Sequence, residues 1–332
     1  MTASACPALS VIIPLHDKAA YVLEAIESVL AQQPAAAEIL VIDDGSTDGG
    51  PERVERWIAG HEAGRIVRLL RQANAGVSVA RNRGIDLARG ELVTFLDADD
   101  RYLPGYFAML AALAAAHPQA GMYCTGFARR WPDGRRVLSG SPGRPARPEG
   151  SLGRVDSFHD WWSRGAFTHT NSIALRRDLL QRDPSLRFMP GERLGEDQDL
   201  WLRVAEAAPV AFANVPLTEY RMDVAGSAMQ NPALADVLPC YQRLARRLQS
   251  GAVPEALRDG ARQLLSVHRI NVASARLDRG DPAGAAQLLF SSGASERRIY
   301  WLRTVLRWAV QRLGLGLRLR SGQDARRPRT EN

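Results

Sequence analysis

Residues 38–48 read Glu38-Ile-Leu-Val-Ile-Asp-Asp-Gly-Ser-Thr-Asp48, and this stretch decides the fold. Its apolar run predicts a short buried strand over residues 38–42, and the polar residues that follow predict a turn. The turn has two interpretations. Asp, Ser and Thr favour an Asx-turn that caps the next helix, whereas a carboxylate at a strand end can accept a hydrogen bond from a nucleotide base.

Strand and helix signals alternate on both sides of this stretch. Apolar runs predict strands, and 3.6-residue spacing predicts helices. The strands are expected at residues 9–14, 66–70 and 91–96, and the helices at residues 19–33, 51–59 and 76–88. This alternation predicts an α/β domain with a mainly parallel sheet flanked by helices. Ligands of such sheets bind at the carboxyl ends of the strands, which directs attention to the residues after Ile13, Ile42 and Leu96.

Three carboxylates follow the predicted strand at residues 91–96. Asp97, Asp99 and Asp100 lie where the backbone leaves the sheet. Carboxylate oxygens are the ligands that Mg²⁺ or Mn²⁺ prefer, and these ions are usually held by few protein carboxylates together with substrate phosphates. The alternative is an acidic turn that caps the next helix. Taken alone, this spacing supports both interpretations.

The remainder of the chain divides into three parts. Residues 131–153 are rich in Pro, Gly, Ser and Arg and predict a long loop. A strand is expected at residues 171–175 and a helix at residues 194–207, with Glu196, Asp197 and Asp199 near its start. From about Pro232 onward, the pattern predicts only helices.

Composition limits the cellular setting and the partners. The chain has 332 residues, 43 Lys+Arg against 36 Asp+Glu, and a net charge of +7. Its three widely spaced cysteines form no disulfide framework, which indicates a reducing compartment. The longest nearly apolar run, residues 106–116, is shorter than the roughly 20 residues that cross a bilayer. We expect a cytoplasmic protein, or one on the inner face of the cytoplasmic membrane. No nucleic-acid-binding motif accompanies the basic charge, so no nucleic-acid partner is expected.

Four segments in order carry a family resemblance. They are Ser10-Val-Ile-Ile-Pro14, Val41-Ile-Asp-Asp-Gly-Ser-Thr-Asp48, Asn74-Ala-Gly-Val-Ser-Val-Ala-Arg-Asn-Arg-Gly84 and Thr94-Phe-Leu-Asp-Ala-Asp-Asp100. Together they resemble the family 2 glycosyltransferases of the GT-A fold. Gly195-Glu-Asp-Gln-Asp-Leu-Trp-Leu-Arg203 resembles that family's catalytic-base helix, and Tyr220-Arg221 its closing segment. The resemblance implies a catalytic domain over residues 1–228, followed by a helical, Arg-rich region over residues 229–332.

The resemblance also implies roles for individual residues. Asp197 would be the general base, with Glu196 beside it, and Asp99, together with Asp100, would bind Mn²⁺ or Mg²⁺. The implied donor-binding residues are Pro14, His16, Asp17, Asp44, Arg81 and Asp97.

Two positions depart from the family pattern. The family often has Tyr-Asn where this chain has His16-Asp17, and a histidine ring can still stack on a base. Many members carry a histidine where this chain has Asp223, so the role of the segment with Arg221 and Asp223, as an acceptor or phosphate contact, stays open.

Three further features have two interpretations each. His169 and Trp161 are candidate acceptor contacts, and each is alternatively a structural residue of the core. The segment 297–320 interleaves Arg and Trp with apolar residues at helical spacing. That composition is typical of a helix in a membrane interface, and the alternative is a helix docked on its own protein with a solvated basic face.

The resemblance implies a metal-dependent, inverting glycosyltransferase. It would move one sugar from a nucleotide-diphosphate sugar, with UDP as the expected nucleotide, to a glycan or lipid-linked acceptor in the synthesis of cell-surface polysaccharide or lipopolysaccharide. A divalent cation would stabilise the leaving diphosphate, and one carboxylate would take the acceptor proton. The alternatives are a sugar-phosphate nucleotidyltransferase and a non-catalytic nucleotide-sugar-binding protein.

Overall fold

The structure is a computed structural model that describes residues 6–139, 148, 150–222, 224 and 236–312. The chain forms two compact units. The first unit comprises Met1–Phe158 and Gly165–Ala228, and the second comprises His159–Arg164 and Met229–Asn332. Every predicted site residue that the structure describes lies in the first unit, apart from Trp161.

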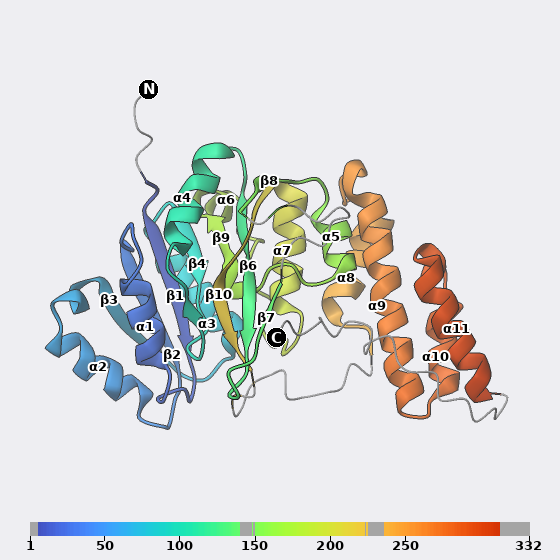
Figure 1. Cartoon of the computed structure of the whole chain (residues 1–332), viewed down its shortest axis with the longest axis horizontal. Helices are drawn as coiled ribbons and strands as arrows, with labels where there is room; N and C mark the ends of the chain where they lie inside the picture. Colours follow the sequence, from blue (N-terminus) through green and yellow to red (C-terminus); the bar gives the residue numbers. More distant parts are fainter. Residues whose placement is uncertain (1–5, 140–147, 149, 223, 225–235, 313–332) are drawn as a thin grey trace. The chain divides into compact units, whose positions relative to one another are not determined.

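One sheet organises the first unit, in which the described residues form ten strands (Figure 1). The main path runs in the order β3-β2-β1-β4-β9-β6-β10-β5, with β7 paired to β6 and β8 to β10. The strands are β1 (Leu9–Leu15), β2 (Glu38–Asp44), β3 (Val67–Gln72), β4 (Leu92–Phe95), β5 (Arg101–Tyr102), β6 (Met122–Arg130), β7 (Arg136–Leu138), β8 (Leu152–Val155), β9 (Ile173–Arg176) and β10 (Val210–Arg221).

The α/β architecture with flanking helices is confirmed. Strands β3, β2, β1 and β4 are all parallel, as the alternating pattern predicts. The apolar runs of β1, β2 and β4 are buried on both faces, which is why they lack a period of two. The helices of this unit are α1 (Val22–Leu30), α2 (Gly50–Gly60), α3 (Val77–Leu87), α4 (Tyr106–Ala116), α6 (Arg177–Arg182) and α7 (Glu196–Ala207).

The other half of the sheet is mixed. Strand β9 runs antiparallel to both β4 and β6, and β10 runs parallel to β6. The range predicted as a loop, residues 131–153, contains β7 and the start of β8. These short strands pair with the edges of β6 and β10, so tertiary pairing outweighs a Pro- and Gly-rich composition there.

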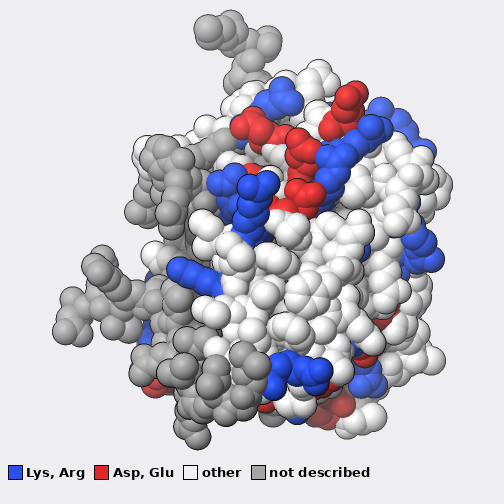
Figure 2. All heavy atoms as spheres, turned by 90° about the vertical axis from the view of Figure 1, so that its right-hand side faces the viewer, with Lys and Arg blue, Asp and Glu red and all other residues white. Residues whose placement is uncertain are grey.

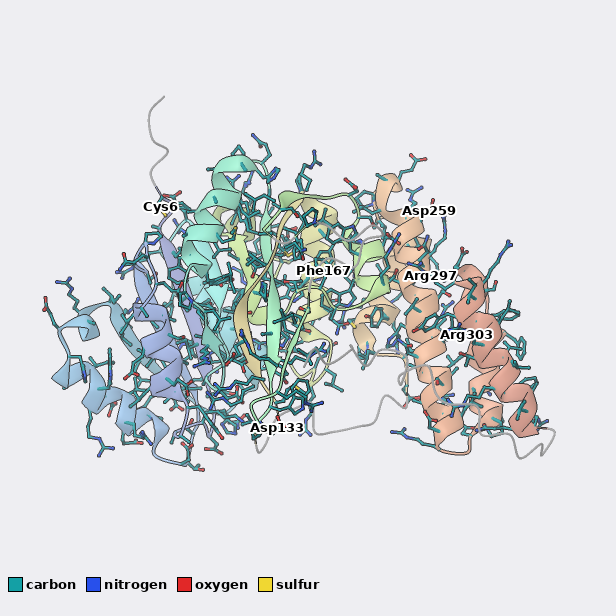
Figure 3. The ribbon with its side chains drawn as sticks, viewed as in Figure 1. Cys6, Asp133, Phe167, Asp259, Arg297 and Arg303 are labelled. Atoms are coloured by element: carbon teal, nitrogen blue, oxygen red, sulfur yellow. The ribbon has the colours of Figure 1, made fainter. Side chains whose placement is uncertain are left out.

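The second unit is helical in the described residues, as predicted from about residue 232 onward. Its helices are α5 (Phe158–Arg164), α8 (Pro239–Gln249), α9 (Arg258–Asp278), α10 (Pro282–Leu289) and α11 (Arg298–Arg312). The first residue of α5, Phe158, belongs to the first unit. Two tryptophans fasten α11: the Trp301 Nε1–H donates to the Leu289 carbonyl (2.7 Å), and the Trp308 Nε1–H to that of Pro282 (2.9 Å). Arg297 and Arg303 mark this segment in Figure 3. Among the described residues, no helix has both the length and the apolar character needed to span a membrane.

Candidate active site

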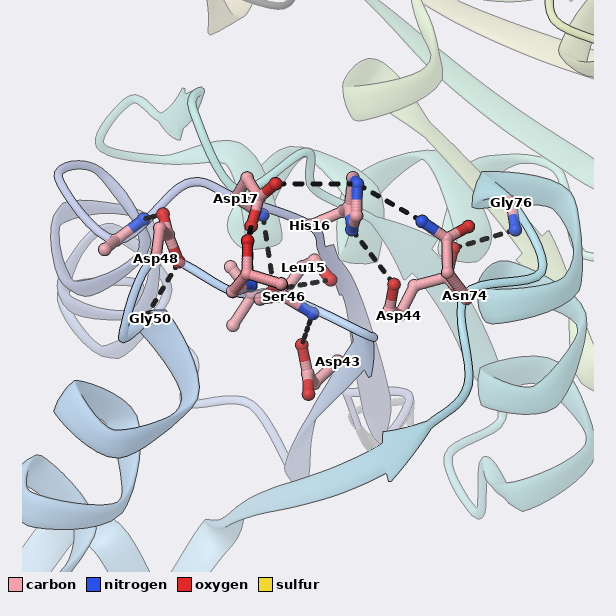
Figure 4. Close-up of polar contacts among 12 residues, drawn as sticks. Leu15, His16, Asp17, Asp43, Asp44, Ser46, Asp48, Gly50, Asn74 and Gly76 are labelled. Carbon is pink, nitrogen blue, oxygen red and sulfur yellow. Dashed lines mark hydrogen bonds and ion pairs between the residues drawn. The ribbon is translucent and has the colours of Figure 1, made fainter.

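His16 links the ends of the first two strands (Figure 4). Its Nδ1–H donates to the main-chain carbonyl of Asp44 (2.9 Å), and its Nε2 accepts from the Asn74 side-chain amide (3.3 Å). The ring is about half exposed, with 47% of its side chain open to solvent. Pro14, two residues earlier in the chain, is half buried beside Ile42. This arrangement holds an imidazole ring rigidly at the carboxyl end of the sheet while leaving it accessible.

Asp44 is almost fully buried, and its carboxylate accepts three hydrogen bonds. Oδ1 accepts from the Gln72 side chain and from the Ala75 main-chain N–H, and Oδ2 accepts from the Gly76 N–H, each at 2.8 Å. Asp44 therefore holds the loop before α3 in place. A carboxylate offers about four acceptor positions, so these three bonds leave room for one further donor.

Asp17 fastens the loop after β1 to the turn after β2. Its Oδ1 accepts from the main-chain N–H of Thr47 (2.7 Å), and its own N–H donates to the Ser46 hydroxyl (3.2 Å). The Thr47 hydrogen bond lowers the pKa of Asp17 below its ordinary value. The backbone of Asp17 lies in the left-handed region, with φ of 49°, a conformation that Asp tolerates better than most residues. Asp17 thus shapes the loop that presents His16.

Arg81 joins two carboxylates that come from distant parts of the chain. Its guanidinium donates to Asp97 Oδ1 (2.7 Å) and to Glu196 Oε1 (3.1 Å), and Arg81 is only 4% exposed. Burial alone would lower the pKa of Arg81, but the two carboxylates raise it above its ordinary value. The loop after strand β4 supplies Asp97, helix α3 supplies Arg81 and helix α7 supplies Glu196, so Arg81 ties three segments into one site.

The two carboxylates respond differently to this shared cation. Burial favours the neutral form of Asp97, but Arg81 outweighs burial and holds the pKa of Asp97 below its ordinary value, with help from His169 and Lys18. For Glu196, burial and the neighbouring charge of Asp197 dominate, and they raise its pKa to about 7 although Arg81 opposes the shift. Asp97 is therefore a carboxylate at neutral pH, whereas Glu196 is partly protonated.

Asp99 and Asp100 are adjacent but have different surroundings. Asp99 Oδ2 lies 3.1 Å from the ammonium of Lys18. Asp100 is 2% exposed and accepts from the Arg221 main-chain N–H (2.7 Å) and from the Asn171 side-chain amide. Burial, followed by the charges of Asp99 and Asp97, raises the pKa of Asp100 well above its ordinary value. The side chain of Asp100 thus fixes the loop internally, whereas that of Asp99, 16% exposed, remains partly accessible beside Lys18.

Asp197 lies at the start of helix α7, where the free N–H groups favour negative charge. The helix begins after Gly195, whose φ of 83° lies in the left-handed region that suits glycine. Asp197 Oδ2 accepts from the Thr170 hydroxyl (2.9 Å), and Oδ1 accepts from the Gln198 N–H (2.7 Å). Asp197 is only partly buried, so a positioned carboxylate remains accessible beside the buried Arg81–Glu196 pair.

The remaining candidates have different outcomes. The His169 ring packs between Tyr220 (4.6 Å between centroids) and Phe127 (5.4 Å), and burial lowers its pKa against the opposing charges of Asp97 and Asp197. Arg221 donates its side chain to Glu24 (2.7 Å). Trp161 belongs to the second unit, and Asp223 lies outside the described residues.

Three residues that contact this site were not among the predicted site residues. Asn171 accepts from the Asp97 N–H (2.9 Å) and donates to Asp100, and Thr170 donates to Asp197. Both lie just before strand β9, and no local pattern marks them. Lys18 could have been noticed from the composition, because it is the only lysine in the chain.

Solved structures of glycosyltransferases share this fold. S. aureus TarS in complex with UDP-GlcNAc matches 92% of this chain and 87% of its own, with a TM-score of 0.66 and 19% identity. The mannosyltransferase PcManGT from Pyrobaculum calidifontis, in complex with GDP-Man and Mn²⁺, matches 93% of this chain and 88% of its own, with a TM-score of 0.57 and 18% identity. The first unit therefore has the GT-A type of fold.

The family is shown by sequence as well. The family model described as Glycosyl transferase family 2 matches residues 10–182, slightly more than half of the 332 residues. The chain belongs to glycosyl transferase family 2, and the resemblance of its motifs is confirmed. The uncharacterized glycosyltransferase YibD of Escherichia coli (strain K12) is 45% identical over 106 residues, which are 32% of this chain and 30% of YibD. Glycosyltransferase GlyG of Streptococcus pneumoniae is 37% identical over 93 residues, which are 28% of this chain and 30% of GlyG.

Proposed function

We propose that the protein transfers one sugar from a UDP-sugar to a hydroxyl of a glycan or lipid-linked acceptor, with inversion at the anomeric carbon. The observation that carries the proposal is the Arg81 bridge between Asp97 and Glu196. It joins the end of β4, where a donor diphosphate would be held, to the start of α7, where a carboxylate can act as base. In this proposal, residues 1–228 are the catalytic domain and residues 229–332 a helical extension.

The donor base is assigned to the loops after β1 and β2. The accessible, fixed ring of His16 offers a stacking surface next to Pro14, and the remaining acceptor position of Asp44 can receive an N–H of the base. Asp17 is assigned to shaping this pocket through Thr47 and Ser46.

The acidic loop fits one divalent cation held by one carboxylate. In the described part of the chain, no three His, Cys, Asp or Glu side chains are grouped so that they could hold a metal ion. An ammonium already contacts Asp99, so this position accommodates a cation. Asp99 would hold Mn²⁺ or Mg²⁺, with diphosphate oxygens and water as further ligands. Bound there, the ion would neutralise charge on the leaving diphosphate. We assign Asp100 to fixing the loop, because both of its oxygens already accept hydrogen bonds.

Asp197 is assigned as the general base. It is accessible, and Thr170 and the helix N-terminus orient it. A single base that deprotonates the acceptor hydroxyl on the side opposite the leaving group gives inversion. Glu196 remains paired with Arg81 and is assigned to positioning.

Calorimetric titration with UDP, with and without Mn²⁺, tests the donor site. We expect UDP to bind more tightly when Mn²⁺ is present, because a cation at Asp99 would bridge the protein to the diphosphate. An Asp99→Asn variant should bind UDP equally in both conditions. Absence of UDP binding in either condition would contradict the uridine assignment, and GDP and dTDP would then be titrated. Tight UDP binding without turnover of any UDP-sugar in the presence of acceptors would favour a non-catalytic binding protein.

The outer face of helix α11 supports a place at the inner surface of the cytoplasmic membrane. Ile299, Leu302 and Leu306 follow helical spacing along one face, and they are 71%, 56% and 59% exposed. The opposite face packs on the α9–α10 core through its tryptophans. Helix α11 is therefore docked on its own unit and also presents an apolar stripe.

Charge around this stripe favours an anionic lipid surface over a second copy of the chain. Arg298 and Arg303 are exposed beside the stripe, and no acidic residue occurs over residues 297–323. Figure 2 shows the molecule from the right-hand side of Figure 1, where both basic and acidic side chains border a broad area of neutral residues. A two-fold dimer through this face would bring like arginines together, whereas phosphate headgroups would neutralise them.

Co-sedimentation with vesicles tests this surface in the full-length protein. We expect binding to vesicles that contain phosphatidylglycerol and little binding to pure phosphatidylcholine. The double variant Leu302→Asp/Leu306→Asp should bind at least about ten-fold more weakly. Full burial of one leucine side chain contributes about 1.5–3 kcal/mol of binding free energy. Leu138→Asp is the matched control, since Leu138 is equally exposed (58%) on the other unit. Equal sedimentation of the wild-type protein and the double variant would rule out the surface.

A further inference from the structure

The proposed mechanism does not explain why the chain has a single lysine, Lys18, or why that lysine lies beside Asp99. The chain carries 43 Lys+Arg, and Lys18 is the only lysine among them. It directly follows the His16-Asp17 pair, between β1 and α1. Its Nζ lies 3.1 Å from Asp99 Oδ2, and both side chains are largely buried, at 15% and 16% exposed. One ammonium, in a chain that otherwise uses guanidinium, therefore contacts the carboxylate assigned to the metal.

The other charges of the loop make Lys18 the main counter-ion of Asp99. Asp97 has its own cation in Arg81. Asp100 is held by the Asn171 side-chain amide and the Arg221 main-chain N–H, so both of its oxygens already have partners. The size of the group matters as well, because an ammonium is a compact point charge whereas a guanidinium is a wide planar fork. Lys18 thus occupies about the volume and charge position that a small cation would take.

We propose that Lys18 is a tethered counter-cation that Asp99 exchanges for the divalent ion when the nucleotide donor binds. The proposal rests on the proposed function of the site. In the free protein, a divalent ion at Asp99 would have to displace the ammonium or share one carboxylate with it, and sharing places like charges close together. A bound diphosphate supplies the negative charge that offsets both cations. The divalent ion therefore binds together with the diphosphate rather than before it.

This exchange makes the binding of the ion and of the nucleotide interdependent. Each should strengthen the binding of the other by the same factor, since linkage between binding sites is reciprocal. Removal of the ammonium should change the affinity for each ligand alone, in opposite directions. The ion would then bind to Asp99 alone more readily, and the nucleotide without metal would lose a cation that faces its diphosphate.

The test is calorimetric titration of Mn²⁺ alone, and of UDP alone, into three full-length proteins. We expect Lys18→Met to bind Mn²⁺ without nucleotide about ten-fold more tightly than the wild-type protein, a factor typical of coupling between sites. Lys18→Arg, which keeps the charge, should stay within a few-fold of the wild-type protein, and Lys18→Met/Asp99→Asn should lose the gain. UDP alone should bind more weakly to Lys18→Met.

Equal Mn²⁺ affinity of the wild-type protein and Lys18→Met, with both folded by circular dichroism, would overturn the proposal. If Lys18→Met does not fold, Lys18→Gln takes its place with the same expected gain. The Mn²⁺ titration needs no nucleotide, so its result is independent of the donor assignment. Failure of UDP to bind any of the proteins would contradict the proposed donor, and the Mn²⁺ comparison would still decide the role of Lys18.

Discussion

An Asp197→Asn variant is expected to bind UDP as the wild-type protein does, while its turnover falls by about 10²-fold or more, the scale of general acid–base groups. The amide keeps the shape of the side chain and can still accept from the Thr170 hydroxyl, which the carboxylate contacts at 2.9 Å. It cannot take a proton from an acceptor hydroxyl. Steady-state release of UDP in the presence of donor and acceptor, combined with calorimetric UDP binding, separates the two effects.

The matched control for this variant lies on the same helix. Glu206→Gln removes a carboxylate from the last turn of α7, and we expect turnover close to that of the wild-type protein. Near-normal turnover of Asp197→Asn would remove Asp197 from the role of base. An equal loss in Asp197→Asn and Glu206→Gln would indicate damage to the helix rather than to the chemistry.

An Arg81→Met variant is expected to lose about 3–5 kcal/mol of unfolding free energy, the usual cost of leaving a buried charge without its partner. Arg81 is 4% exposed and lies 2.7 Å from Asp97 and 3.1 Å from Glu196. Its removal therefore leaves these two carboxylates without the cation that they share. Glu196, with a pKa of about 7, can escape part of this cost by taking up a proton. Asp97 is held ionised mainly by Arg81, and without it burial would raise the pKa of Asp97. Urea denaturation at neutral pH measures the loss.

Arg83→Met provides the comparison on the same helix. Arg83 is only partly buried and donates to the Arg71 main-chain carbonyl (2.8 Å) and the Gln72 side chain (3.3 Å), both neutral groups. We expect its replacement to cost no more than about 1–2 kcal/mol. Similar losses for the two variants would show that Arg81 contributes packing rather than charge.

The parallel half of the fold could be predicted because its strands are continuous apolar runs between helical segments. Strands β6 and β10 escaped prediction for a different reason. β10 contains Pro216 and has register shifts on both sides of it, so no simple alternation marks it. β6 carries a glycine, Gly126, at its centre. Both strands are defined by their pairing with each other, which links residues about ninety positions apart.

In the candidate site, too, local sequence predicted residues with a chemical role but not the distant residues that contact them. The acidic motifs predicted site roles for Asp97, Asp99 and Asp197. Their partners could not be predicted, because Arg81 reaches Glu196 across 115 positions of sequence and Asn171 reaches Asp97 across 74. The difference between the partly accessible Asp99 and the fully buried Asp100 depends on Asn171 and Arg221, which no local pattern connects to the acidic loop.

The two hydrogen-bond partners of Asp100 also determine when the acidic loop can become fixed during translation. The four parallel strands are complete once Phe95 has been made, and the acidic loop follows within five residues. Its anchors come much later, Asn171 first and the main-chain N–H of Arg221 last. The parallel half of the sheet can therefore take shape early in translation. The loop after β4 obtains its final anchor only when the nascent chain has reached residue 221 of 332.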